Sequence, residues 1–195
     1  MLNHKGTNII ETERLILRPF RSEDAPVMFR NWAGDREVPR YLTWNVHRSV
    51  ADSECVVNMW VAQYNDIKTY NWVIVLKEIG EPIGSIGVCR LYENIDSAEI
   101  GYCIGKPWWN KGIMTEAFSA IIPYLFEVGF NRIDAAHAVK NPASGRVMQK
   151  CGLKYEGTFR QFFRSTAGEL LDLSFYSILR EDFLSGKLNS HNASE

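Results

Sequence analysis

The chain has 195 residues, of which 46% are hydrophobic and 23% are charged, and its formal net charge is −1. This size and composition are typical of one soluble globular domain with a single hydrophobic core. With a net charge near zero, no overall basic field favours binding to nucleic acid or to an anionic membrane surface.

No segment is expected to span a membrane or hold a metal ion. The first residues lack the long apolar core of a signal peptide, and polar residues and a proline interrupt the longest apolar stretch, residues 117–130. The four cysteines lie far apart, with neither a CxxC pair nor zinc-type spacing: Cys55, Cys89, Cys103 and Cys151. We therefore predict free thiols, no metal and a cytoplasmic location.

The first third of the chain predicts a strand followed by two helices. Residues 14–20, RLILRPF, alternate apolar and polar side chains as a half-buried strand does. Residues 22–34 begin with Ser22 as the expected N-cap and carry acids in the first turn, which indicates a helix. A second helix is expected over residues 49–64, where apolar residues recur at helical spacing.

The middle of the chain predicts a hairpin, a third strand and a buried helix. Residues 70–79 and 82–92 are strand-like and are joined by a tight turn. Residues 97–105 read as the next strand. The helix expected over residues 111–128 is apolar on more than one side, so we expect it to be buried, with a bend at Pro123.

The last third predicts a strand, a short helix and a second antiparallel pair. The strand covers residues 132–139, and the helix over residues 141–152 ends at Gly152. The final two strands are long and flank a turn near Gly168.

The order of these elements predicts the fold. The strands at 98–104 and 132–139 flank the buried helix, and such a β-α-β crossover makes its two strands parallel. The expected fold class is α/β (α+β), with a mixed, mostly antiparallel seven-stranded sheet and helices on both faces. We expect one domain at residues 11–182, an N-terminal extension at 1–10 and a polar tail at 183–195.

The segment WWNKGIMTEA, residues 108–117, leads into the buried helix. The first turn of a helix presents backbone N–H groups without internal partners, and the helix dipole favours negative charge there. Gly112 lets an anion approach closely, and Lys111 adds a cation beside it. The segment therefore predicts a phosphate or pyrophosphate site on the amides of about Lys111 to Met114, although a lone glycine here is also ordinary turn chemistry.

The stretches AEIGYCIGKPWWNKGIMTEA and NPASGRVMQKCGLKYEGTFRQ, together with RLILRPF, resemble the GCN5-related N-acetyltransferase superfamily. They look most like its ribosomal-protein N-terminal acetyltransferase branch, over about residues 11–182. The resemblance implies acetyl-CoA as co-substrate, with its pyrophosphate on the turn at 111–114. Its pantetheine arm would lie between the splayed strands at 98–104 and 132–139, where its amides can pair with a strand that has lost its neighbour.

This resemblance implies a set of contacts to acetyl-CoA around the splayed strands. Asn141 matches a side chain that bonds the pantetheine amide, with a helix N-cap as its structural alternative. A strand amide near Tyr102 or Cys103 would polarise the thioester oxygen. The expected contact residues are Tyr102, Cys103, Ile104, Lys111, Gly112, Ile113, Met114, Thr115, Asn141, Ser144 and Arg146.

Three side chains are candidates for moving protons. Glu99 matches a strand glutamate that serves as base in several superfamily members, and its alternative role is an exposed residue or a partner of Arg90 or Arg132. His137 is the second candidate base because its pKa suits neutral pH, although such a histidine is more often packed and hydrogen-bonded. Ser144 matches a serine that protonates the leaving thiolate, or it satisfies amides at a helix start.

Four positions depart from the superfamily pattern. Trp109 and Met114 replace the glutamine or arginine and the small residue that are usual in the turn. Met148 stands where many members carry a proton-donating tyrosine, and Phe163 stands where the ribosomal branch carries an acid. Binding through backbone amides should survive these changes, but they also fit a non-catalytic acyl-CoA-binding protein.

The leading hypothesis is acetyl transfer from acetyl-CoA to a primary amine by direct attack in a ternary complex. The acceptor implied by the resemblance is the N-terminal α-amine of a ribosomal protein, while a polyamine, an antibiotic or an amino-acid conjugate stays open. A nucleotide-binding protein is disfavoured because there is no GxGxxG motif and no P-loop. Exposed strand ends near the C-terminus allow a homodimer. Trp44 is a candidate for the acceptor site, and the other tryptophans are expected mostly in the core.

Overall fold

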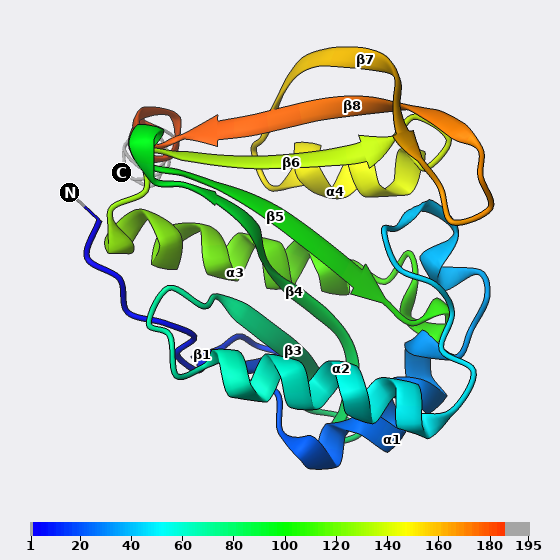
Figure 1. Cartoon of the computed structure of the whole chain (residues 1–195). Coiled ribbons are helices and arrows are strands. Elements are labelled where there is room, and N and C mark those ends of the chain that lie inside the picture. The colour runs from blue at the N-terminus through cyan, green and yellow to red at the C-terminus, as the bar shows by residue number, and fades with distance from the viewer. Residues whose placement is uncertain (1, 186–195) are drawn as a thin grey trace.

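The computed structural model describes residues 2–185. Within this range the chain forms one sheet of eight strands, in the order β1-β2-β3-β4-β5-β6-β8-β7 (Figure 1). The strands are β1 (Ile10–Glu11), β2 (Leu15–Arg18), β3 (Asn71–Leu76), β4 (Glu81–Tyr92), β5 (Ser97–Ile104), β6 (Arg132–Ala138), β7 (Lys154–Arg164) and β8 (Leu170–Leu179). The main helices are α1 (Ala25–Met28), α2 (Val50–Gln63), α3 (Ile113–Val128) and α4 (Pro142–Lys150).

The predicted fold class is confirmed, but the described sheet has eight strands rather than seven. The additional strand, β1, is two residues long and pairs antiparallel with β2. Two residues carry too little hydrophobic alternation to be recognised in a sequence. The residues before β1 also contact the domain, since the N–H of Asn3 donates to the carbonyl of Val128 at 2.7 Å.

The first predicted helix is less regular than expected. A 3-10 turn, the four residues of α1 and a π-helical turn follow one another. Ser22 lies inside the first turn and is not its N-cap; the N–H of Arg21, which precedes it, donates to the carboxylate of Asp24 at 2.8 Å. Asp24 is buried and pairs with Arg18 at 2.7 Å, so an ion pair rather than a serine hydroxyl holds this start.

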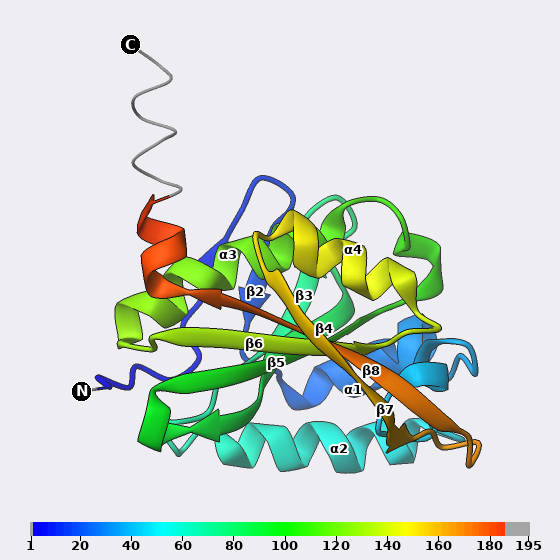
Figure 2. The same ribbon diagram turned by 90° about the horizontal axis from the view of Figure 1, so that it is seen from above.

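Two apolar layers lie on opposite faces of the sheet. Figure 2 shows α3 and α4 on one side of the strands and α1 and α2 on the other. The larger layer packs Phe118 of α3 against the sheet, and the smaller layer contains Trp32. Because side chains alternate along a strand, Ile100 and Tyr102 of β5 join the α3 side, whereas Cys103 joins the α2 side. Thus β5 contributes side chains to both layers.

The predicted buried helix, α3, is confirmed. It begins at Ile113, two residues later than expected, because Gly112 has a left-handed φ of 74° and stands at the N-cap. Its buried side chains lie on several sides of the helix, and Pro123 lies within it. The α3 start is therefore fixed by a glycine in a conformation that other residues adopt at a cost.

The parallel pair is confirmed and is short. β5 and β6 pair only through Ser97↔Arg132, Ala98↔Ile133 and Glu99↔Asp134. Beyond that point β6 stays paired with β8, and β5 stays paired with β4. The two strands therefore diverge after three residue pairs and leave a gap in the sheet.

Candidate active site

The gap leaves backbone groups of β5 without a strand partner. The N–H of Gly105 donates to the carbonyl of Ile83 at 2.9 Å, so this register pairs Gly105 with β4. Backbone groups alternate in direction along an antiparallel strand, which turns the N–H and C=O of Tyr102 and Ile104 away from β4 and toward the gap. The end of β5 is therefore an open edge inside the sheet.

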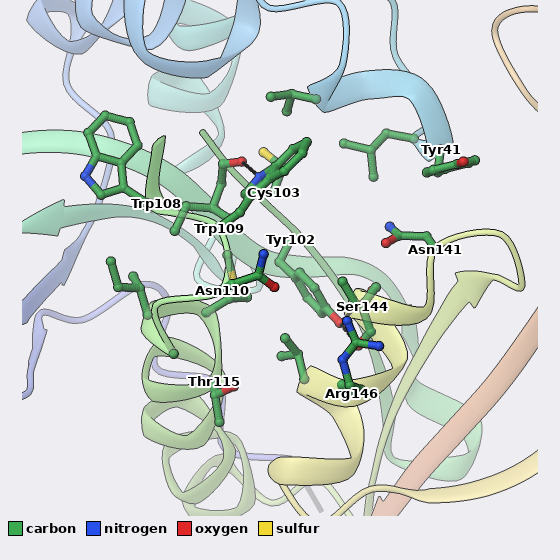
Figure 3. Close-up of a pocket in the computed structure, with 18 of the residues that line it drawn as sticks. Tyr41, Tyr102, Cys103, Trp108, Trp109, Asn110, Thr115, Asn141, Ser144 and Arg146 are labelled. Atoms are coloured by element: carbon green, nitrogen blue, oxygen red, sulfur yellow. Dashed lines mark hydrogen bonds between the residues drawn. The ribbon is translucent and has the colours of Figure 1, made fainter. Parts of the chain in front are cut away.

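A cavity of about 400 Å³ lies at this gap (Figure 3). Four segments that are far apart in sequence build its walls. They supply Glu37, Val38, Arg40, Tyr41 and Leu42 after α1; Tyr102, Cys103 and Ile104 of β5; Trp108, Trp109, Asn110, Gly112, Ile113, Met114 and Thr115 at the start of α3; and Asn141, Ala143, Ser144, Arg146, Val147 and Lys150 at α4.

The start of α3 gives the cavity an anion-binding wall. Asn110 and Gly112 both have left-handed backbones, with φ of 59° and 74°. The first helical bond runs from the N–H of Glu116 to the carbonyl of Gly112 at 3.0 Å, so the N–H groups of residues 113–115 have no acceptor within the helix. Those amides and the dipole of a 16-residue helix favour a phosphate at this wall.

The opposite wall contains a half-buried hydroxyl pair. Figure 3 shows Tyr102 pointing from β5 toward Ser144 at the start of α4. The Tyr102 hydroxyl lies 2.8 Å from Ser144 Oγ and 3.0 Å from the Ser144 carbonyl oxygen, to which it can donate. Burial raises the pKa of Tyr102 well above its ordinary value, so the phenol stays protonated at neutral pH. It can donate a hydrogen bond but cannot act as a base.

Most of the residues that the sequence predicted for the cofactor meet at this cavity. The lining includes Tyr102, Cys103, Ile104, Gly112, Ile113, Met114, Thr115, Asn141, Ser144 and Arg146. Lys111 does not line it; it lies instead in a neighbouring hollow of about 280 Å³ with Arg14 and Trp108. Lys111 precedes Ile113, the first residue of α3, by two positions.

Glu99 does not line the cavity. It is the last residue of β5 that pairs with β6, so it lies where the gap begins rather than inside it. Its carboxylate accepts a hydrogen bond from the Tyr92 hydroxyl at 3.3 Å and lies 3.7 Å from Arg90. Its side chain is 25% exposed, so water reaches it.

His137 also lies outside the cavity lining. Its Nδ1 is 2.8 Å from the carbonyl oxygen of Ala138, which can only accept, so Nδ1 carries the proton. Its ring lies 5.6 Å from that of Tyr176 and directly under Gly145 of α4. These contacts make His137 part of the packing between β6 and α4.

Sequence reasoning missed two parts of the lining. Residues 37–42 carry no recognisable motif, and only the folded chain brings them to the cavity. Trp109 is 38% exposed, and its indole N–H donates to the carbonyl of Ile104 at 2.8 Å, so this carbonyl has a side-chain partner in place of a strand partner. The sequence signal that could have indicated Trp109 as a lining residue was its position in the turn that leads to Gly112. Trp44 does not line the cavity and lies against the ring of His47 at 5.6 Å.

Comparison with known proteins identifies the family. The acetyltransferase (GNAT) domain family matches residues 14–154, most of the chain. The chain belongs to the GNAT acetyltransferase family. The uncharacterized N-acetyltransferase YoaA of Bacillus subtilis (strain 168) is 34% identical over 88% of this chain and 97% of YoaA. This acetyltransferase therefore matches YoaA over nearly the whole length of both proteins.

Two other relatives support the same assignment. The putative ribosomal N-acetyltransferase YdaF of Bacillus subtilis (strain 168) is 31% identical over 74% of this acetyltransferase and 79% of YdaF. A solved structure of RimL, a ribosomal L7/L12 α-N-protein acetyltransferase in complex with coenzyme A, has a TM-score of 0.79. It is 20% identical, with 88% of this chain and 98% of RimL covered, so it shows the shared fold.

The acetyltransferase family is an enzyme family whose members use acetyl-CoA, so this chain is an acetyl-CoA-dependent acetyltransferase. Over residues 2–185, no group of three or more His, Cys, Asp or Glu side chains is arranged to hold a metal ion. In the same range, none of the helices combines the length and apolar character that a membrane crossing requires.

Proposed function

We propose that the cavity binds acetyl-CoA and that the acetyl group passes directly to the N-terminal α-amine of a protein. One observation carries this proposal: a single cavity combines the bare amides of the α3 start with the open edge of β5. A molecule that carries both a pyrophosphate and an amide-containing arm matches these two features. Acetyl-CoA is such a molecule.

The two ends of the proposed ligand fit different walls. The pyrophosphate lies on the amides after Gly112, and Arg146 supplies a cation across the cavity. The pantetheine arm lies along β5, where its amides pair with the N–H and C=O of Tyr102 and with the N–H of Ile104, since the Ile104 carbonyl already accepts from Trp109. The coenzyme A in the solved RimL structure, a protein of the same fold, supports this ligand class.

The chemistry needs a proton acceptor for the amine and a proton donor for the leaving thiolate. In the proposed mechanism Glu99 accepts the proton of the amine through water. Glu99 lies on the same face of β5 as Cys103, which lines the cavity, and Gly101 between them has no side chain that would separate the two. Ser144 donates to the thiolate, and its hydroxyl already lies in the cavity. His137 is less suited because it packs under Gly145.

An α-amine is the proposed acceptor because a water-mediated base suffices for it. An α-amine has a pKa of about 8, whereas a lysine side chain has a pKa of about 10.4. At neutral pH, deprotonating the lysine costs about 3 kcal/mol more. The described cavity offers no carboxylate other than Glu37, which is already paired with Lys106 at 2.7 Å. The similarity to YdaF, named as a putative ribosomal N-acetyltransferase, supports a protein acceptor.

Calorimetry tests the ligand, and a thiol-release assay tests the reaction. We expect acetyl-CoA to bind in the micromolar range, with no binding of ATP or NAD. With N-terminal peptides as acceptors, Ser144→Ala should slow thiol release at least about ten-fold without weakening acetyl-CoA binding, since it removes only the proton donor. Val139→Ala, an exposed position outside the cavity, is the control.

Two results would contradict the proposal. Absence of acetyl-CoA binding would remove the ligand assignment and every role that depends on it. Acetyl-CoA binding with thiol release only from small amines, and none from peptides, would retain the ligand and overturn the protein acceptor.

A further inference from the structure

One side chain links the β1–β2 connection to the α3 start from outside the cavity. Arg14, just before β2, donates from Nη1 to the carbonyl of Lys111 at 3.1 Å. The same guanidinium holds the carboxylate of Glu116 in the first turn of α3, with Nε and Nη2 both 2.6 Å from Oε2. Arg14 therefore contacts the turn on both sides of Gly112.

The turn that Arg14 contacts has a constrained backbone. Asn110 and Gly112 are both left-handed, a conformation that is strained for Asn110 because it carries a side chain. Lys111 lies between them, and Arg14 binds its carbonyl. Holding that carbonyl fixes the peptide plane between Lys111 and Gly112, and hence the direction of the Gly112 N–H. The next peptide along the chain carries the N–H of Ile113, the first of the amides proposed to bind pyrophosphate.

The negative charge of Glu116 opposes anion binding at the α3 start, and Arg14 neutralises this charge. A carboxylate in the first turn of a helix lies near any anion bound at that helix end, and like charges repel. Burial opposes ionisation of Glu116, but hydrogen bonds from Thr12 and Arg14 outweigh it and lower the pKa of Glu116, so the carboxylate is charged. Arg14 provides the neutralising cation, and Thr12 Oγ1 and the Arg14 N–H donate at 2.6 and 3.0 Å.

We propose that Arg14 is a positioning residue for the phosphate end of acetyl-CoA. It acts through the turn: it bridges the Lys111 carbonyl and the Glu116 carboxylate, orients the amides after Gly112 and cancels the charge of Glu116. This inference rests on the proposed function. It assigns Arg14 a role in the recognition of phosphate and none in acetyl transfer itself.

Comparison of two acetyl donors tests the inference. Acetyl-CoA carries the pyrophosphate, whereas S-acetyl-pantetheine has the same thioester and arm without any phosphate. We expect Arg14→Ala to lower the ratio of kcat/KM for acetyl-CoA to that for S-acetyl-pantetheine about ten-fold, mainly through KM for acetyl-CoA. The lysine in Arg14→Lys can neutralise Glu116 but cannot bridge its carboxylate and the Lys111 carbonyl. This variant should therefore restore the ratio of kcat/KM only partly toward that of the parent protein.

Arg18→Gln is the matched control, because it removes another arginine of the same segment. Arg18 pairs with buried Asp24 at 2.7 Å, away from the α3 start. We expect Arg18→Gln to lower Tm and to leave the ratio of kcat/KM for the two donors unchanged. A change of this ratio in Arg14→Ala would then not be a consequence of lower stability. An unchanged ratio in Arg14→Ala, or full recovery in Arg14→Lys, would overturn the inference. If the parent protein binds no acetyl-CoA, it is the proposed function that has failed.

Discussion

At the scale of single residues, the Tyr102–Ser144 pair decides where a proton can go. The Tyr102 proton can be given to the Ser144 carbonyl, to Ser144 Oγ or shared between them. When it goes to Oγ, the proton of Ser144 is free to point into the cavity. In the proposed mechanism Tyr102 then sets the direction in which Ser144 donates, and it does so from β5 rather than from position 148, which Met148 occupies.

Replacing Tyr102 by phenylalanine isolates this effect. The Tyr102 ring packs against Phe118 at 5.6 Å, and phenylalanine preserves that packing. We expect Tyr102→Phe to lower kcat about three- to ten-fold, with KM for acetyl-CoA nearly unchanged, because Ser144 loses its directing partner but no cofactor contact is removed. Steady-state kinetics and Tm measure the two quantities. A kcat equal to that of the parent would show that Ser144 needs no partner.

The sequence could predict part of the cavity lining but not how the lining residues contact one another. Ten of the predicted contacts lie in short stretches around Tyr102, Gly112 and Ser144, and a recognisable pattern marks each stretch. The Tyr102–Ser144 pair joins residues 42 positions apart, and the bridge from Arg14 to Glu116 spans 102 positions. Such contacts depend on strand order and on side-chain direction, which one sequence does not specify.

At the scale of secondary structure, the packing of α4 on β6 holds Ser144 in place. Gly145 lies against His137 so closely that a Cβ there would be 2.5 Å from Nε2 and 3.0 Å from Cε1. The His137 ring cannot easily move away from Gly145, because it is hydrogen-bonded to the carbonyl of Ala138 and packs beside Tyr176. The absence of a side chain at position 145 therefore sets the distance between the helix and the sheet.

Adding a methyl group at this contact should weaken the domain. We expect Gly145→Ala to lower the free energy of unfolding by about 1–3 kcal/mol, measured by urea denaturation, since it forces the ring or the helix to move. Gly101→Ala is the control, because its Cβ would meet Cys89 Sγ at an ordinary 3.6 Å. Adding His137→Ala to Gly145→Ala should restore part of the loss; if the two changes are simply additive, the steric contact is not the cause.

The elements themselves were predicted well where hydrophobic periodicity is strong. The hairpin of β3 and β4, the strand β5 and the buried α3 all follow from it. Prediction failed for β1, which is too short to show a period, and for residues 22–34, where a buried ion pair takes the place of a regular helix start. Both failures occur where pairing with a nearby segment, β1 with β2 and Arg18 with Asp24, determines the local structure without any hydrophobic period.

At the scale of the whole molecule, the smaller apolar layer is connected to the sheet through Tyr64. This residue follows α2, and its hydroxyl donates to the carbonyl of Asn71 on β3 at 2.6 Å. The same oxygen accepts the N–H of Phe20, which follows β2, at 2.9 Å. One phenol therefore joins α2 to two strands, on the side of the sheet opposite α3.

This connection should make stability depend on alkaline pH. Burial raises the pKa of Tyr64 to about 12, above its ordinary value of 10. A raised pKa in the folded state means that folding holds the proton more tightly, so its contribution is complete below about pH 10 and is lost as pH rises toward 12. Two pKa units correspond to at most about 2–3 kcal/mol.

Tyr64→Phe separates this contribution from the other groups that titrate in alkali. The variant should be less stable by about 1–2 kcal/mol at pH 8, because the Phe20 N–H and the Asn71 carbonyl lose their partner. Between pH 10 and 12 its free energy of unfolding should fall less steeply than that of the parent, because phenylalanine has no proton to lose. Urea denaturation at several pH values measures both slopes. Parallel slopes would mean that the hydroxyl of Tyr64 releases its proton as readily in the folded protein as in the unfolded chain, and the link from α2 to the sheet would then not depend on that proton.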